Sequence, residues 1–264
     1  MSPPDRPAGG YRNAPHEDTP ASLLAQREGS VVTLTINRPD RRNALDAATY
    51  GALSERIAQA SADASVSAVI LTGAGEHFTA GNDLRDFQSG RGPGDSAGLA
   101  FLRVLSTCEA PVIAAVEGYA IGIGVTLLQH CDFVHIGDAA TLRMPFVALG
   151  LCPEGASSLL MPRLAGARRA ARWLMQGKAF TAAEALQAGL ATAVEPAGQA
   201  LAAARQTAAD LAAQPIAALR LTKAMLKRAD RQAIQETLDY EAGQFRARLQ
   251  TEEAQAAFAR FFKK

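Results

Sequence analysis

The chain has 264 residues and a formal net charge of +1, because 27 Lys and Arg side chains nearly balance 26 Asp and Glu side chains. This balance gives no strong overall field that would favour nucleic acid or an anionic membrane as a partner. Hydrophobic residues make up 48% and charged residues 20% of the chain, which is typical of a folded globular protein and not of a disordered one. The length predicts one large domain or two small ones.

The cysteines and the apolar stretches indicate the cellular compartment in which we expect the protein. Cys108, Cys131 and Cys152 are an odd set without Cys-x-x-Cys spacing, so we expect reduced thiols and a cytoplasmic location, with no disulfide framework. The longest apolar stretches, residues 112–116 and 120–128, are too short and too interrupted by glycine to span a bilayer. We therefore expect no membrane partner.

The N-terminal part predicts one strand and one helix. Residues 1–25 are rich in Pro, Gly, Asp and Arg without an apolar period, so we expect a disordered extension, with folding starting near Glu28. Residues 31–36 alternate between an apolar and a mixed face, which predicts a strand with one face buried. Asp46 is a candidate N-cap for a helix over residues 47–61.

Three short segments follow and predict further strands, of which the first two are apolar throughout. They cover residues 68–71, 112–116 and 132–136. A helix ending near Cys108 and a second helix reaching His130 separate them. Apolar strands that alternate with helices are typical of a mostly parallel sheet covered by helices, so the predicted fold class is α/β.

The last part of the chain is dominated by alanine-rich helical patterns. Within it, Thr181-x-x-Glu184 is typical of a capping box at a helix start, and Gly189 is placed to end the same helix. We divide the folded chain into a core over residues 26–195 and a helical region over residues 196–264.

Two glycine turns follow buried strands, at residues 78–84 and 118–124. Such turns leave backbone N–H groups free, and these can hold a phosphate or a developing oxyanion. The alternative is that the glycines only permit tight turns. A dinucleotide-binding motif is not complete, because Leu127 stands where the third glycine would be.

Residues 149–156, LGLCPEGA, hold one carboxylate, Glu154, after an apolar run. If apolar side chains surround it, loss of hydration raises its pKa and allows it to accept and donate a proton near neutral pH. The alternative is a surface-loop glutamate beside Pro153 and Gly155. Local sequence leaves both alternatives open.

A metal site is considered and not expected. His130, Cys131, Asp132 and His135 lie close in sequence, but they fall on a helix end and a strand that direct their side chains differently. We therefore predict no metal.

Five segments together carry a family resemblance from about residue 28 to the C-terminus. In chain order they are NRP at 37–39, NAL at 43–45, FTAGNDL at 78–84, PVIAAVEG at 111–118 and GIGVTLL at 122–128. With them the chain resembles the crotonase, or enoyl-CoA hydratase/isomerase, superfamily. The resemblance implies an α/β fold with a spiral of ββα units and a helical C-terminal trimerisation region, which points to a homotrimer or a dimer of trimers.

The family's substrates are acyl-CoA thioesters, so the resemblance implies that coenzyme A enters as part of the substrate and that no separate cofactor is needed. The two backbone N–H groups that hold the thioester carbonyl match Asn82 and Ile123. The same matching suggests CoA-ester contacts for six further residues: Arg42, Ala44, Ala80, Gly81, Asp83 and Leu84. For Arg42, which follows Arg38 and Arg41, the alternative is a solvated basic turn.

The carboxylates suggest which reaction of the superfamily applies. Hydratases of this family hold a water with two glutamates, whose positions are occupied here by Thr126 and Phe146. The segments GND at 81–83, GIGVTLL at 122–128 and LGLCPEG at 149–155 look like the peroxisomal-type Δ3,Δ2-enoyl-CoA isomerases. In that branch the glutamate of the Pro-Glu-Gly step is the catalytic base, which matches Glu154.

The resemblance thus implies an isomerase that moves a double bond from C3 to C2 of an enoyl-CoA with one glutamate and an oxyanion hole. Two alternatives stay open at this stage. The first is a hydratase or another crotonase-type reaction, and the second is a non-catalytic acyl-CoA-binding protein.

Overall fold

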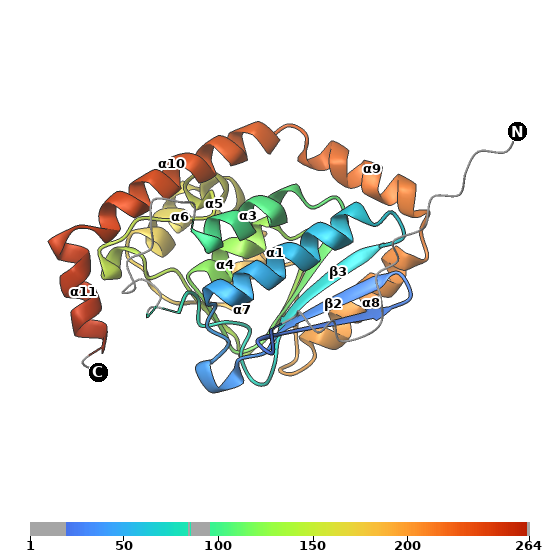
Figure 1. The fold of residues 1–264 in the computed structure, drawn as a ribbon, viewed down its shortest axis with the longest axis horizontal. Coiled ribbons are helices and arrows are strands. Elements are labelled where there is room, and N and C mark those ends of the chain that lie inside the picture. The colour runs from blue at the N-terminus through green and yellow to red at the C-terminus, as the bar shows by residue number, and fades with distance from the viewer. Residues whose placement is uncertain (1–19, 84, 86–95, 263–264) are drawn as a thin grey trace, which may run out of the picture.

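The computed structural model describes residues 20–83, 85 and 96–262, without the side chains of residues 261 and 262 (Figure 1). Leu84, one of the predicted CoA contacts, and most of the predicted N-terminal extension lie outside these residues. Across the described part of the chain, no helix combines the length and the apolar character that crossing a bilayer requires.

Among the described residues, the main sheet has six strands in the order β1-β2-β3-β4-β6-β9. Strand β1 is antiparallel to β2, and every other neighbouring pair is parallel. The predicted α/β class with a mostly parallel sheet is therefore confirmed. The strands are β1 (Leu23–Glu28), β2 (Val31–Ile36), β3 (Ala68–Gly73), β4 (Val112–Val116), β6 (Phe133–Gly137) and β9 (Ala193–Glu195).

The expectation that folding starts near Glu28 was wrong, because β1 begins at Leu23 inside the range expected to be disordered. Leu23 is buried and lies opposite Ile36 across the antiparallel pair. The two residues between β1 and β2, Gly29 and Ser30, form a hairpin turn, with Gly29 at a φ of 59°. The strand is recognisable only from this turn and its partner, because its own residues after Ala25 are polar.

Helices cover both faces of the sheet, which explains why its central strands are apolar throughout. On one face, Val69 and Leu71 of β3 pack in the cluster that includes residues of α1 (Ala47–Ala62) and α3 (Ala97–Thr107). On the other face, Ala68 and Ile70 pack against α8 (Ala200–Ala212). Figure 1 shows α1 and α3 side by side. Asp46 caps α1 as predicted, since its side chain accepts a hydrogen bond from the Thr49 N–H.

A second sheet lies beside the first and has the order β5-β7-β8 among the described residues. It consists of β5 (Tyr119–Ile121), β7 (Thr141–Arg143) and β8 (Phe180–Thr181). The predicted glycine turn at 118–124 therefore contains a short strand. The predicted helix after this turn is two short elements, α4 (Ile123–Thr126) and the 3-10 helix η2 (Leu127–His130).

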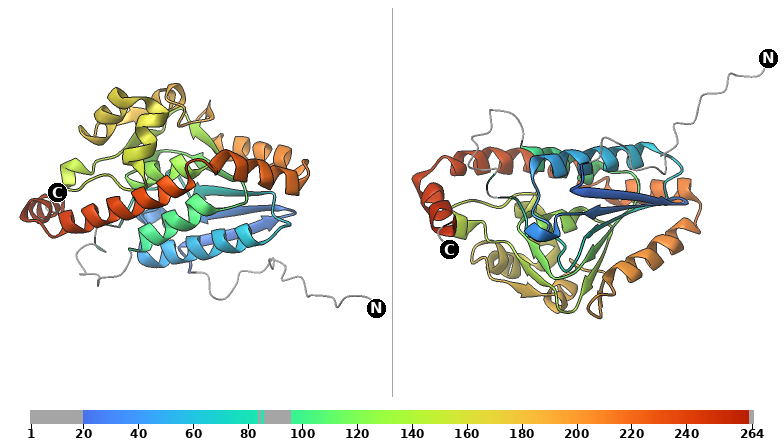
Figure 2. Two further views of the ribbon diagram at one scale, coloured as in Figure 1. Left: turned by 90° about the horizontal axis from the view of Figure 1, so that it is seen from above. Right: turned by 60° about the horizontal axis from the view of Figure 1, so that its bottom comes forward.

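The C-terminal helices lie against the core. Helix α10 contacts α3 and α5, and α11 contacts the 3-10 helix η3. The views in Figure 2 show α10 running past these core helices toward α11. The remaining elements are η1 (Pro39–Arg41), η3 (Val147–Leu149), α5 (Ser157–Ala165), α6 (Ala167–Leu174), α7 (Ala182–Gln187), α9 (Ile216–Lys227), α10 (Arg231–Leu249) and α11 (Glu252–Phe262).

The predicted capping box of α7 is present. The Thr181 side chain accepts from the Glu184 N–H at 3.2 Å, and the Glu184 carboxylate accepts from the Thr181 N–H at 3.0 Å. Replacing Thr181 with Ala removes one acceptor from the helix start, so we expect the free energy of unfolding to fall by about 1 kcal/mol in urea denaturation.

The matched control is Thr107→Ala, because Thr107 is exposed in the last turn of α3 and its hydroxyl bonds back to the Arg103 and Val104 carbonyls of its own helix. This control should change the free energy of unfolding by less than about 0.5 kcal/mol. Equal losses in the two variants would contradict the assigned role of the capping box.

Candidate active site

The two glycine turns identified in the sequence lie side by side. Thr79 and Ala120 form a parallel bridge, and the Ile121 N–H donates to the Thr79 carbonyl at 3.1 Å. Gly81 has a φ of +88°, and a Cβ at this position would come within 2.6 Å of the Ile121 carbonyl oxygen. Glycine is therefore required here both by the backbone conformation and by the close approach of the second turn.

The turns present the two N–H groups that the sequence singles out. The neighbours of Asn82 both bond to Leu45: the Leu45 N–H donates to the Gly81 carbonyl at 2.8 Å, and the Asp83 N–H donates to the Leu45 carbonyl at 2.9 Å. The Asn82 N–H therefore points away from Leu45, because successive groups alternate along an extended chain. Ile123 is the first residue of α4, where an N–H has no acceptor within the helix.

Within the described residues, neither the Asn82 N–H nor the Ile123 N–H meets an acceptor. Both donors are thus available to a negatively charged oxygen.

Side chains from α1 and from the preceding loop hold the first donor. The Tyr50 hydroxyl, on α1, donates to Asn82 Oδ1. Asp83 is paired with Arg38 at 3.3 Å, and Arg38 is also 3.2 Å from Asp46 at the start of α1. The sequence did not point to Tyr50. It lies within a helix, and its neighbours in sequence give no indication that it contacts Asn82 in the turn.

Glu154 lies in the loop between η3 and α5, which contains two glycines with positive φ, Gly150 at 71° and Gly155 at 74°. The Glu154 side chain is not on the open surface, because its Oε1 atom is buried and has no hydrogen-bond partner among the described residues. Burial, and secondly the nearby Glu241 carboxylate, raise the pKa of Glu154 to about 8. This carboxyl group therefore exchanges a proton in the neutral range.

The Glu154 loop packs against the helix that carries the second donor. A Cβ at Gly155 would lie 2.9 Å from the Cβ and Oγ1 atoms of Thr126, one turn after Ile123. Phe146 is buried, and its ring lies 3.9 Å from where a Cβ of Gly122 would be. Two residues stand at the hydratase glutamate positions: Thr126 lies against the Glu154 loop, and Phe146 lies against the second glycine turn.

The predicted CoA contacts gather around the first glycine turn. The Ala80 N–H donates to the Arg42 carbonyl at 2.9 Å, and the Ala44 carbonyl accepts from the Arg38 guanidinium. Arg42 is exposed, with its guanidinium 5.7 Å from the centroid of the Tyr119 ring. Arg42 is free to turn toward a phosphate, whereas Arg38 is held by its two carboxylate partners.

Two predicted contacts have other roles in the structure. Gly81 is buried at the contact between the two turns, and the Asp83 carboxylate is engaged by Arg38. Their contribution to CoA binding stays a prediction.

The described part of the chain contains no group of three or more His, Cys, Asp or Glu side chains that could hold a metal ion. His130 Nε2 is 2.9 Å from the Gly155 carbonyl, and burial lowers the pKa of His130 to about 4, so this imidazole is neutral. His135 contacts Glu195 and Thr207 instead, each at 2.9 Å. The two histidines therefore belong to different environments.

Sequence reasoning also missed Glu241, a buried carboxylate on α10. Its two oxygens accept hydrogen bonds from the Ala156 N–H at 2.7 Å and the Ser158 N–H at 2.8 Å, just after Glu154. A signal was present, because Ile234, Leu238 and Glu241 recur at helical spacing and are all buried. A charged residue on the apolar side of a helix indicates a specific partner.

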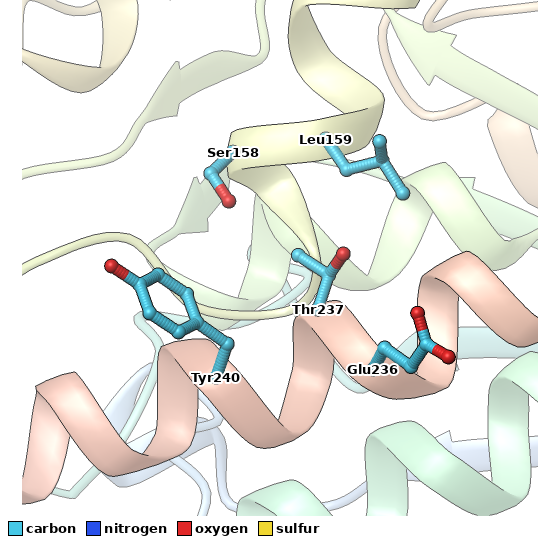
Figure 3. A pocket seen from close by; sticks show the side chains of 5 residues that line it. All are labelled: Ser158, Leu159, Glu236, Thr237 and Tyr240. Atoms are coloured by element: carbon cyan, nitrogen blue, oxygen red, sulfur yellow. The ribbon is translucent and has the colours of Figure 1, made fainter.

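An open hollow of about 310 Å³ lies between α5 and α10, as Figure 3 shows. Its lining consists of Ser158, Leu159, Glu236, Thr237 and Tyr240. Neither Glu154 nor the two donors line it, so it is separate from the candidate active site.

Comparison with known proteins identifies the family of the chain. A family model described as Enoyl-CoA hydratase/isomerase matches residues 26–264. The chain is 37% identical over 181 residues to enoyl-CoA delta isomerase 2 of Rattus norvegicus, which covers 66% of this chain and 46% of that protein. It is 34% identical over 179 residues to 2,3-dehydroadipyl-CoA hydratase of Escherichia coli K12, with 67% of this chain and 70% of that protein covered.

A solved structure of an enoyl-CoA hydratase/isomerase from Pseudoalteromonas atlantica superposes with a TM-score of 0.87 at 36% identity, covering 92% of this chain and 97% of that one. The relatives include both isomerases and hydratases, and the chain spans about half the length of the rat isomerase. The fold and the resemblance predicted from the five segments are confirmed, and the chain belongs to the enoyl-CoA hydratase/isomerase, or crotonase, family.

Proposed function

We propose that this protein is an enoyl-CoA isomerase that moves a double bond from C3 to C2 of an acyl-CoA thioester. The observation that carries the proposal is the Glu154 carboxylate, which has one buried oxygen without a partner among the described residues and lies in a loop packed against the helix of the Ile123 donor. A base with a pKa of about 8 is suited to both taking and returning a proton near neutral pH.

The reaction needs one base and two donors. Glu154 takes a proton from C2 of the 3-enoyl thioester, and the electron pair spreads over a dienolate that ends at the thioester oxygen. The Asn82 and Ile123 N–H groups hold this oxygen, a contribution of about 3 kcal/mol per donor in comparable sites. Glu154 then returns the proton at C4, so atoms and charge balance without any other reactant.

The side chains at the hydratase positions favour isomerisation over hydration. Thr126 and Phe146 supply no carboxylate there, and Phe146 fills space beside Gly122. Glu241 is a second carboxylate near Glu154, but both of its oxygens accept backbone N–H groups. No carboxylate pair is therefore free to hold a water, among the residues that the structure describes. The rat isomerase among the relatives supports the same reaction, while the Escherichia coli hydratase makes hydration the activity to test beside it.

The decisive test is Glu154→Gln, assayed with a medium-chain trans-3-enoyl-CoA by formation of the conjugated 2-enoyl thioester. We expect isomerisation to fall by about 10²-fold to 10⁴-fold, because the amide cannot take the C2 proton, while CoA-ester binding changes little. In the unchanged protein, kcat/KM should rise with pH through about 8, since deprotonated Glu154 is the active form in the free protein.

The control for this test is Glu236→Gln, an exposed glutamate on α10 that bonds only to Gln232 among the described side chains. It should keep the full isomerase rate. Hydration of a 2-enoyl-CoA without isomerisation would contradict the proposal in favour of a hydratase, and binding without either reaction would indicate a non-catalytic protein.

Phe146 provides a second test. Phe146→Ala opens space beside Gly122 and admits water to the dienolate, so we expect kcat to fall by about tenfold through weaker electrostatic stabilisation. The control is Phe133→Ala, since Phe133 packs against the cluster under α8 on the far face of the sheet. Equal rates for Phe146→Ala and the unchanged protein would show that Phe146 does not exclude water.

The assembly is also a proposal: a homotrimer or a dimer of trimers. Supporting it, Leu221, Met225 and Leu226 of α9 are large apolar side chains that are 62%, 69% and 78% exposed in the single chain. Light scattering on the purified protein in solution should give a molar mass three or six times that of one chain. A stable monomer would contradict this assembly.

A further inference from the structure

Glu241 is a buried carboxylate whose contacts lie beside the candidate base. It is 4% exposed on α10, and its two oxygens accept the Ala156 and Ser158 N–H groups at 2.7 and 2.8 Å. These donors belong to the start of α5, two and four residues after Glu154. A helix start normally leaves such N–H groups without acceptors, so Glu241 acts as the N-terminal cap of α5 from another helix.

The backbone that Glu241 holds is in an unfavourable conformation. Gly155 and Ala156 are consecutive residues in the left-handed region, with φ values of 74° and 57°. Ala156 has a Cβ, for which this region is disfavoured. Such a segment keeps its conformation only where its surroundings fix it, and the bond from the Ala156 N–H to Glu241 is one of these fixing contacts.

Helix α10 holds the Glu154 loop at both ends. Arg248 Nε donates to the Gly150 carbonyl at 2.8 Å before Glu154, and Glu241 accepts the N–H groups after it. A Cβ at Gly150 would also lie 2.8 Å from the Ala254 Cα atom, so α11 packs directly against the start of the Glu154 loop. The side chain of Glu154 thus extends from a loop that is anchored on either side.

We propose that Glu241 is the positioning residue of this active site: by holding the first turn of α5, it directs the Glu154 carboxylate toward the acyl-CoA beside the Asn82 and Ile123 donors. The inference rests on the proposed isomerase function. Glu241 does not itself transfer the proton, because backbone donors engage both of its oxygens.

The charge of Glu241 adds a second effect at the same place. As a like charge, it disfavours ionisation of Glu154 and contributes, after burial, to the raised pKa of that group. The other titratable groups at the loop are His130, which is neutral, the half-buried Cys152, and Arg248, which is also paired with Glu253. Burial raises the pKa of Glu241 too, and the Ser158 and Ala156 N–H groups act against that rise.

The test compares Glu241→Gln with Glu236→Gln on the same helix. An amide at 241 keeps the size of the side chain but turns one acceptor into a donor that faces a backbone N–H, and it removes the charge. We expect kcat to fall about tenfold or more with KM within about twofold, and the rise of kcat/KM with pH to move to lower pH by about half a unit or more. Glu236→Gln should leave the rate and the profile unchanged.

A measurement without turnover separates this inference from the proposed function. In protein labelled with ¹³C at the glutamate carboxyl groups, Glu154→Gln identifies the Glu154 resonance by its loss. The titration of that resonance should move to lower pH in Glu241→Gln and stay in place in Glu236→Gln. If the unchanged protein isomerises but Glu241→Gln matches it in kcat and in the Glu154 titration, the positioning role is wrong. If the unchanged protein does not isomerise at all, the proposed function fails whatever the titration shows.

Glu241→Asp keeps the inference testable if the glutamine variant does not fold. Aspartate retains the charge but is one methylene too short to reach both N–H groups. We expect a fall in kcat of about fivefold or more with the Glu154 titration displaced less than in the glutamine variant. A kcat equal to that of the unchanged protein would overturn the positioning role.

Discussion

The site depends on one buried carboxylate oxygen, Oε1 of Glu154, that no described donor satisfies. Leaving a buried polar atom without a partner costs about 1 to 3 kcal/mol, so the surrounding packing must hold it in place. The same cost makes the group useful, because an environment that disfavours the charged form brings the pKa of Glu154 to about 8. The loop glycines, the bond from His130 to the Gly155 carbonyl and the cap by Glu241 together maintain this unfavourable arrangement.

The donors of the site arise from a different constraint, the pairing of two turns. The bridge between Thr79 and Ala120 brings together segments that follow neighbouring strands, and glycine at 81 allows the close approach. The paired backbone of the two turns, with the Tyr50 bond to Asn82 and the Arg38 ion pair with Asp83, then fixes the Asn82 and Ile123 N–H groups. Donors that are fixed before the substrate arrives need no rearrangement as charge develops, which is why backbone groups serve this purpose well.

Local patterns predicted much of the fold. The apolar strands β3 and β4, the Asp46 cap and the capping box at Thr181 were predicted correctly, because each depends on residues close in sequence. The strand starting at Leu23 was missed because its pairing with β2, and not its own composition, makes it a strand.

In the candidate site too, features set by local sequence could be predicted, whereas contacts between distant residues could not. Glu154, Asn82 and Ile123 stand in short motifs that can be read in the sequence, and their catalytic roles stay predictions. Tyr50 contacts Asn82, which is 32 residues away in the sequence, and Glu241 contacts Ala156, which is 85 residues away. No local sequence pattern predicts either contact. A buried acid on an otherwise apolar helix face was the one signal available for Glu241.

The anchoring of the Glu154 loop by α10 has a consequence for how the protein matures on the ribosome. The second of the two turns needs residues up to 143, because the Gly122 N–H donates to the Arg143 carbonyl at 2.8 Å, whereas Gly150 and Ala156 wait for partners 98 and 85 residues later in the chain. In a nascent chain, the two N–H donors can therefore take up their positions well before the Glu154 loop is anchored. Under the proposed function, proton transfer becomes possible only after α10 has docked against this loop, so an incompletely synthesised chain is inactive.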